Sequence, residues 1–325
     1  MALSEIVANS WEFREKTPMD AVSDNIPFFS RLKKKGGVKT ITGGYEIRAN
    51  IRYAQNNYVQ LIDPNEEFAL GYNQTMTAFQ YSPKIIITPT LINALEKAQN
   101  SGEGEFLNLL DEREQIAEDS LVNIMEAMLQ GDGTTYGGKA FAGIKSYVVD
   151  STSTGTVGGL ARSTYSAIRN TSVNLVSTFT GATDSSNIES RLRYLKNLVI
   201  RNGNGPDWGF LGQTYYLAAC DAASAKQRIT QDADMVKMNF DHVVIEGMTC
   251  VNAAGKSYSG RTSIAADRAY LLPSKDYALV MYKGYNMQPL DNRTAYNQLV
   301  DASVLCGIGN FITYGPGQSA VGYDS

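Results

Sequence analysis

The chain contains one histidine, His242, and three cysteines, Cys220, Cys250 and Cys306. Any Ser-His-Asp triad, Cys-His pair or histidine-rich metal site would have to use that histidine. It precedes the apolar run 243–245, and this position is more typical of a residue at the edge of a strand than of a general base. The cysteines form no CxxC pair, so the sequence indicates neither a zinc site nor a disulfide framework.

Motifs for nucleotide binding or nucleophilic catalysis are also missing from the sequence. It has no GxxxxGK[ST] phosphate loop and no GxSxG elbow. Ser30–Lys33 fits SxxK but continues into Lys34 and Lys35, which is typical of a basic turn. The glycine-rich stretch Gly203–Gly209 follows a helical pattern rather than a strand, so we interpret it as a helix stop and a turn. We therefore expect no cofactor, no metal and no enzymatic activity.

Acidic residues leave one catalytic alternative open. The densest acidic cluster, Glu103–Asp119, lies on a predicted helix, where it is best explained as a solvated face. Sequence spacing cannot exclude that two other carboxylates meet in space as an acid/base pair. A carboxylate-based hydrolase therefore remains an alternative, and it would need a pocket lined by Asp or Glu of perturbed pKa.

Composition limits the class of protein. The 325 residues have a mass of 35.5 kDa, a net charge of −4, 43% hydrophobic and 19% charged residues, which predicts one large or two ordinary globular domains. The mean hydropathy is −0.23, and no apolar run approaches the roughly 20 residues that cross a bilayer. A mildly acidic chain is not a free nucleic-acid binder by bulk charge. The N-terminus does not resemble a secretory signal, so we expect synthesis in a reducing cytoplasm.

The first 36 residues show no sustained period, and Pro18 and Pro27 interrupt them. Aromatic side chains, among them Trp11, Phe28 and Phe29, are scattered among charges. Such a segment cannot build a core of its own, so we expect an arm that becomes ordered by lying on something else.

An extended ribbon is predicted next, over residues 37–84. Five residues alternate with polar ones in a period of two, which is a strong strand signal: Tyr45, Ile47, Ala49, Ile51 and Tyr53. Gly43 and Gly44 are expected to form a turn that joins this strand to 38–42. An isolated ribbon is marginally stable in water, so it must lie on the rest of the chain or on another chain.

Beyond the ribbon the pattern alternates between helices and strands without a βαβ repeat. Apolar residues spaced by three and four predict a helix over 105–130, about 39 Å long, that ends at Gly131–Gly133. Further helices are predicted over 188–200 and 213–228. Strands are predicted over 207–211, 243–251, 268–272, 277–282 and 301–314. This order predicts an α+β fold.

Three segments in this order carry a resemblance to a known family. The long helix ends in Ala127–Thr134 and continues into Gly137–Ile144; a helix over Ile188–Ile200 is followed by Trp208–Leu211 and a helix at Tyr215; and Asn297–Phe311 forms a long closing strand. The ordered set, over nearly the whole chain, resembles the major capsid proteins of tailed bacteriophages, the Hong Kong 97-type shell fold.

The resemblance implies a division of the chain. Residues 1–36 would be the N-terminal arm and 37–84 the extended β-ribbon loop. Residues 85–150, with the spine helix, and the closing strands in 265–325 would form the peripheral domain. Residues 151–264 would form the axial domain.

The resemblance also implies a function. The chain would be a structural subunit that self-assembles into the icosahedral head enclosing a phage genome. An encapsulin-like nanocompartment shell shares the fold and is an alternative. The expected location is the virion, with no membrane association.

Partners and interface residues follow from the same resemblance. The chain would bind itself in pentamers and hexamers, and would meet portal, scaffolding and decoration proteins and packaged double-stranded DNA on the inner face. Arg31 and Lys33–Lys35 are hypothesised to meet acidic neighbours or DNA. The expected assembly interface comprises Trp11, Phe28, Phe29, Arg31, Lys33, Lys34, Lys35, Tyr45, Ile47, Ile51 and Tyr53.

Overall fold

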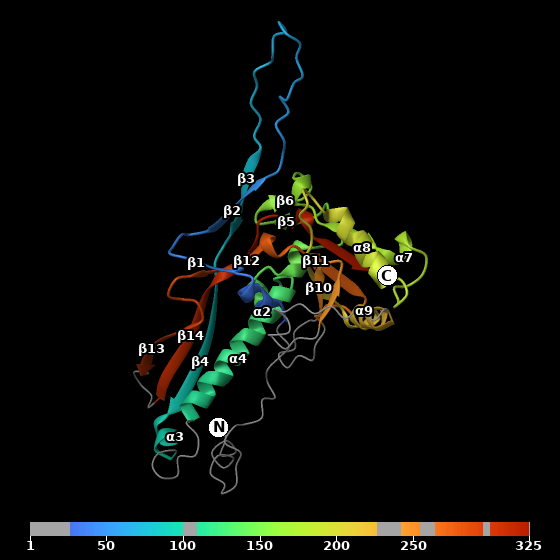
Figure 1. The fold of residues 1–325 in the computed structure, drawn as a ribbon. Coiled ribbons are helices and arrows are strands. Elements are labelled where there is room, and N and C mark those ends of the chain that lie inside the picture. The colour runs from blue at the N-terminus through green and yellow to red at the C-terminus, as the bar shows by residue number, and fades with distance from the viewer. Residues whose placement is uncertain (1–26, 100–108, 226–241, 254–263, 295–299, 325) are drawn as a thin grey trace.

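The computed structural model describes residues 27–99, 109–225, 242–253, 264–294 and 300–324. These segments build two β-sheets with helices packed against them, and a β-ribbon that projects away from the body (Figure 1). The mixed α+β class predicted from the sequence is confirmed. Most of the predicted arm, including Trp11, lies outside the described residues.

The first sheet has five strands, which are β1 (Val38–Ile41), β12 (Tyr277–Tyr282), β14 (Val300–Thr313), β13 (Gln288–Thr294) and β4 (Lys84–Asn93). Strand β14 is the longest, and it pairs antiparallel with β4, β12 and β13. Its 14 residues agree with the closing strand predicted over 301–314.

Strand β1 corrects one sequence prediction. It does not form a hairpin with the next strand across Gly43 and Gly44, because it pairs parallel with β12, with Val38 opposite Leu279. Hydrogen bonds from Leu279 N to Gly37 O (2.8 Å) and from Lys283 N to Ile41 O (2.8 Å) extend this pairing at both ends. An alternating pattern shows which face a strand buries, but it does not identify the strand that pairs with it.

The second sheet has six strands in the order β7 (Thr171–Asn174), β15 (Ala320–Tyr323), β11 (Arg268–Leu272), β8 (Trp208–Leu211), β10 (Met248–Asn252) and β9 (His242–Ile245). Helices α8 (Ile188–Val199) and α9 (Gln213–Ala225) pack against it. His242 is the first residue of β9, so it lies at the edge of a strand as the sequence predicted, and β9 is itself an outer strand of this sheet.

Two boundaries in this region differ from expectation. The single strand predicted over 243–251 is a hairpin, β9–β10, because Glu246 and Gly247 both take positive φ (51° and 75°) and turn the chain. The predicted boundary at 264/265, between the segment 151–264 and the closing strands in 265–325, does not separate the two sheets. Strands β11 and β15 follow this boundary in the chain but pair with β8 and β7, which precede it. Strand pairing between distant segments, which spacing along the chain does not reveal, sets this division.

The remaining elements are shorter or connect these layers. They are α2 (Pro27–Lys34), β2 (Ile47–Arg52), β3 (Met76–Tyr81), α3 (Ala94–Gln99), α4 (Leu109–Gln130), α5 (Thr135–Gly138), α6 (Ile144–Tyr147), β5 (Thr156–Val157), β6 (Leu160–Ala161), η1 (Ser166–Ile168), α7 (Leu175–Thr178), η2 (Ser274–Asp276) and η3 (Pro316–Gln318).

Strand β8 is buried on both faces and joins two cores. Trp208 and Phe210 lie in the larger core, which also contains side chains of α2, α4 and the five-stranded sheet. Leu211, on the opposite face, lies in the smaller core beneath α8 and α9. An all-apolar strand of this kind is expected where layers cover both faces of a sheet.

Helix α4 buries the apolar face that its residue spacing predicted. Its 22 described residues span about 33 Å. Its buried apolar positions recur at intervals of three and four, at Ala117, Leu121, Met125 and Met128. Residues 105–108 of the predicted helix lie outside the described residues.

Glu126 of α4 is fully buried and holds the start of α2. Its carboxylate oxygens accept hydrogen bonds from Phe28 N (3.1 Å), Phe29 N (2.8 Å) and Gln130 Nε2 (2.7 Å). The first amide groups of a helix have no partner within the helix, and the helix dipole favours a negative charge there. The buried carboxylate thereby supplies hydrogen-bond acceptors for the first amide groups of α2, and these donors in turn compensate the burial of its charge.

This contact corrects the prediction that all of residues 1–36 form an arm with nothing of its own to pack on. Phe28 and Leu32 are fully buried in the larger core, and the Phe28 ring lies 4.9 Å from that of Phe210. Arg31 is also buried, with its guanidinium 5.4 Å from the centre of the Trp208 ring. A helix of eight residues is too short for its period to stand out in the sequence.

The turn η2 connects β11 of one sheet to β12 of the other, and it contains a partly buried carboxylate. Burial raises the pKa of Asp276 from 3.8 to about 6, while Lys275 lowers it and Asp207 raises it further. The Asp207 carboxylate lies nearby, where its Oδ1 accepts a hydrogen bond from Ser274 N (2.6 Å).

Removal of the Glu126 carboxylate should destabilise the fold strongly. Glu126→Ala leaves buried N–H groups of α2 without an acceptor, so we expect the free energy of unfolding to fall by about 3 kcal/mol. Glu126→Gln keeps one acceptor oxygen and should cost less. Denaturant unfolding of both variants checks this, and an alanine variant within 1 kcal/mol of wild type would contradict it.

Neutralising Asp276 should stabilise the protein in a pH-dependent way. The folded pKa lies above the unfolded value, so the folded state binds more protons between pH 3.8 and about 6, and stability falls as the pH rises through that window. Asp276→Asn should therefore raise the melting temperature relative to wild type at pH 7.5 but not at pH 4. Asp184→Asn is the control, because hydrogen bonds from Ser186 lower the pKa of Asp184, and it should bring no gain. Equal gains from Asp276→Asn at both pH values would contradict the prediction.

Candidate assembly surfaces

The base of the ribbon packs on its own chain. Strands β2 and β3 pair antiparallel, with Ile47 opposite Tyr81 and Ala49 opposite Phe79, and all four side chains are buried. The period of two predicted for this strand is confirmed, with the apolar positions facing the larger core. The Tyr53 ring meets that of Tyr165 edge-on at 4.9 Å.

Contacts from two distant segments fix the direction of the ribbon. The Tyr81 hydroxyl donates a hydrogen bond to Thr313 O (3.0 Å), and burial raises the pKa of this phenol. Gln80 N donates to Gly158 O (2.9 Å). Gly158 has φ 51°, and a Cβ there would lie 2.7 Å from Phe79 Cβ, so only glycine allows the β5–β6 hairpin to approach this closely.

The tip of the ribbon, residues 54–75, extends beyond every other element (Figure 1). Side chains, rather than a backbone ladder, hold its two arms together. Gln60 Oε1 accepts from Ala69 N (3.1 Å) and Gln60 Nε2 donates to Ala69 O (3.3 Å). Asn73 Nδ2 donates to Gln55 O (2.9 Å).

Large apolar side chains of this tip lie in solvent. Leu70 is 88% exposed, and the exposed set is Tyr58, Val59, Leu61, Ile62, Phe68, Leu70 and Tyr72. A contiguous exposed apolar surface is typical of an interaction site. The sequence analysis did not select these residues; the available signal was a pair of apolar runs flanking Asp63 and Pro64.

A second apolar surface lies on the outer face of β4. Ile85, Ile87 and Leu91 alternate along the strand and are all exposed, whereas Ile86 packs on the larger core. This outer face was also missed, because a continuous apolar run gives no indication that one of its faces remains uncovered.

The structure divides the predicted interface residues into three groups. Phe28, Phe29, Arg31 and Ile47 are buried within their own chain, so their assignment to an intersubunit surface was wrong. Ile51 and Tyr53 are half-buried at the ribbon base. The exposed group, which keeps the role as a proposal, is Tyr45, Lys33, Lys34 and Lys35.

Three of these exposed residues are consecutive in the chain, and we call them the lysine cluster: Lys33, Lys34 and Lys35. They lie at the end of α2, whose buried face holds Phe28 and Leu32. The helix therefore anchors an exposed positive charge to the core.

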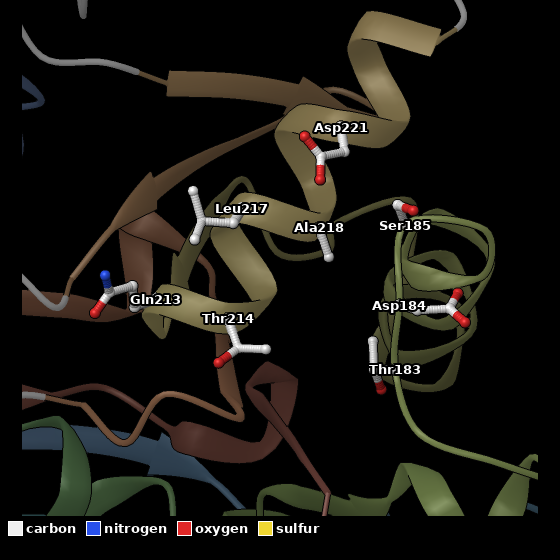
Figure 2. A pocket seen from close by; sticks show the side chains of 8 residues that line it. All are labelled: Thr183, Asp184, Ser185, Gln213, Thr214, Leu217, Ala218 and Asp221. Carbon is white, nitrogen blue, oxygen red and sulfur yellow. The ribbon is translucent and has the colours of Figure 1, made fainter.

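A groove lies between α9 and the loop that precedes α8 (Figure 2). Its volume is about 470 Å³, and it is lined by Thr183, Asp184, Ser185, Gln213, Thr214, Leu217, Ala218 and Asp221. The Thr183 hydroxyl already makes hydrogen bonds within the chain, since its Oγ1 accepts from Arg191 Nη1 (2.7 Å) and donates to Asp324 Oδ1 (2.9 Å). This network ties the loop to the C-terminal strand.

Two carboxylates that line cavities in the described part of the chain, Asp184 and Asp132, do not have the properties of a general acid. In the groove of Figure 2, hydrogen bonds from Ser186 lower the pKa of Asp184. In a second cavity of about 360 Å³ at the ribbon base, hydrogen bonds from Thr134 lower the pKa of Asp132. A general acid needs a raised pKa, so these groups do not support a carboxylate-based hydrolase.

Searches for other site types give negative results within the described ranges. No group of three or more His, Cys, Asp and Glu side chains there is arranged to hold a metal ion. None of the helices in those ranges has both the length and the apolar character to cross a bilayer.

Comparison with known proteins finds similarity at the level of structure only. No family model matches the sequence, and no curated protein matches it. The capsid asymmetric unit of cyanophage A-1(L) has a TM-score of 0.68 at 13% identity, covering 99% of this chain and 98% of that one. The capsid of Myoviridae phage XM1 has a TM-score of 0.58 at 11% identity, covering 100% and 99%. The holo-SrpI encapsulin complex of Synechococcus elongatus PCC 7942 has a TM-score of 0.58 at 9% identity, covering 99% and 96%.

These likenesses span nearly the whole length of each chain. The fold of this protein is therefore the one found in phage capsids and in an encapsulin shell.

Proposed function

We propose that this chain is a major capsid protein, a structural subunit that self-assembles into the icosahedral head enclosing a phage genome. The observation that carries the proposal is the tip of the ribbon, where seven large apolar side chains project from the body. Within the described ranges these side chains stay exposed, which supports a second copy of the chain as the surface that covers them.

The structural neighbours support the phage reading over its alternatives. Two of the three shells described above are phage capsids, and they include the one with the highest TM-score of the three, 0.68. The encapsulin likeness keeps a protein-filled nanocompartment as the second candidate. The contents of purified particles, DNA or a cargo protein, separate the two.

The Hong Kong 97-type division of the chain belongs to this proposal. The ribbon, here β2, β3 and the tip, acts as the extended loop, and α4 acts as the spine helix. The five-stranded sheet forms the peripheral domain, and the six-stranded sheet with α8 and α9 forms the axial domain around the symmetry axes of pentamers and hexamers. Portal, scaffolding and decoration proteins, DNA, and the virion as location stay predictions from the resemblance.

The outer face of β4 is the surface on which we place the tip of a neighbouring copy. An arm of ten residues in the tip is about 33 Å long, as is the ten-residue β4. Both surfaces are apolar and exposed, and each large side chain contributes about 1.5–3 kcal/mol when fully buried. A stable interface typically buries more than about 1,000 Å² per pair, and the tip seated on β4 would supply part of that area.

Purified chain should form megadalton particles, or pentamers and hexamers, whereas a hydrolase would form a discrete small oligomer. Size-exclusion chromatography with light scattering and negative-stain microscopy measure this. A monodisperse monomer or dimer at all concentrations would exclude the proposed function.

Replacing two apolar tip residues should impair assembly without unfolding the chain. Leu61→Ser with Leu70→Ser should raise the concentration needed for particles more than tenfold, since every 1.4 kcal/mol of lost contact is a factor of ten. Gln55→Ser with Asn57→Ser, in the same tip, is the polar control. If the leucine variant assembles like its control, the tip is not the assembly surface.

A further inference from the structure

The apex of the ribbon is a closed, preorganised turn. Glu66 N donates to Asp63 O (3.1 Å), and Asp63 N donates to Glu66 Oε2 (3.0 Å). Pro64 and Asn65 occupy the centre of the turn, and Asn65 has φ 81°, as a type II turn requires at that position. The turn therefore presents its side chains in one geometry before any partner binds.

The apex carries negative charge only. Asp63, Glu66 and Glu67 are all exposed, and residues 53–75 contain no Lys or Arg. The apolar residues of the tip lie on either side of this charge. Apolar contact can hold the arms on a partner, but it does not fix how far along the partner the apex lies.

The lysine cluster has the complementary charge. Three consecutive lysines are exposed at the end of α2, and the anchoring of α2 through Glu126 fixes their place on the body. The apex points away from the body, far from α2 of its own chain (Figure 1). The two surfaces can therefore meet only between copies.

We propose that the acidic apex of one copy docks on the lysine cluster of a second copy and sets the register of the ribbon on its neighbour. The inference rests on the proposed function, which supplies the second copy. Charged contacts across an interface give specificity and alignment more than affinity, whereas the apolar arms supply the affinity. Because both surfaces are exposed, salt should weaken this contact.

Charge reversal in two separate chains tests the contact. The apex variant carries Asp63→Lys and Glu67→Lys, which leaves in place the Glu66 carboxylate that closes the turn. The cluster variant carries Lys33→Glu, Lys34→Glu and Lys35→Glu. At about 50 mM salt, where the Debye length exceeds 10 Å, each variant alone should lose at least tenfold of its particle yield. An equimolar mixture should recover part of the lost yield, because each variant offers the complement of the other wherever the two kinds of copy are neighbours. Light scattering measures the yield.

Two controls separate the possible causes. Glu118→Lys adds charge of the same sign as the apex variant at an exposed site of α4, outside the ribbon and the proposed axial domain, and it should assemble normally. Circular dichroism of each variant should match wild type, and recovery on mixing excludes a folding defect.

Three results would overturn the inference while leaving the proposed function intact. The first is normal assembly of both reversed variants. The second is an equal loss in the Glu118→Lys control, which would assign the effect to net charge. The third is normal assembly of the cluster variant with reduced DNA content in its particles, which would place the lysines against nucleic acid.

Discussion

One buried carboxylate determines where the N-terminal part of this chain lies. Glu126 sits in the middle of the larger core, and an unpaired charge there would be strongly unfavourable. The amide groups at the start of α2 and the side-chain amide of Gln130 satisfy it together. Once α2 is held in this way, Phe28 can pack against Trp208 and Phe210 of β8. Since β8 faces both cores, α2, α4 and the two sheets then form one packed unit.

Local periodicity predicted the elements that face a single core. The alternation of Ile47 and Ala49 gave the correct inward face of β2, and the spacing in α4 gave its buried stripe. Pairing over long distances could not be predicted, because β1 lies beside β12, more than two hundred residues away, and nothing in its four residues specifies that partner. The turn at Glu246 was missed for another reason, since glutamate rarely takes positive φ and the sequence there reads as one continuous strand.

The sequence predicted that the N-terminal region and the ribbon contact a neighbouring copy, but it did not identify which of their residues are exposed. Aromatic residues without a visible period suggested contact with a neighbouring copy, but Phe28 and Phe29 of α2 are buried in the core of their own chain. Glu126 is one acid among many in its helix, and its burial cannot be recognised without the amide groups that face it. Exposure of Leu61 and Leu70 is likewise a property of the folded arrangement, because the same apolar run inside a sheet would be covered.

The side-chain bonding of the tip has a consequence for how this protein can change. A ladder of backbone pairs would force both arms to lengthen or shorten in register, whereas Gln60 and Asn73 each bridge the arms at one point. Insertions or deletions beyond those bridges leave Tyr81, Gly158 and the core beneath them untouched. The length of the ribbon can therefore change independently of folding, so that its reach can vary while the body beneath it keeps the same packing.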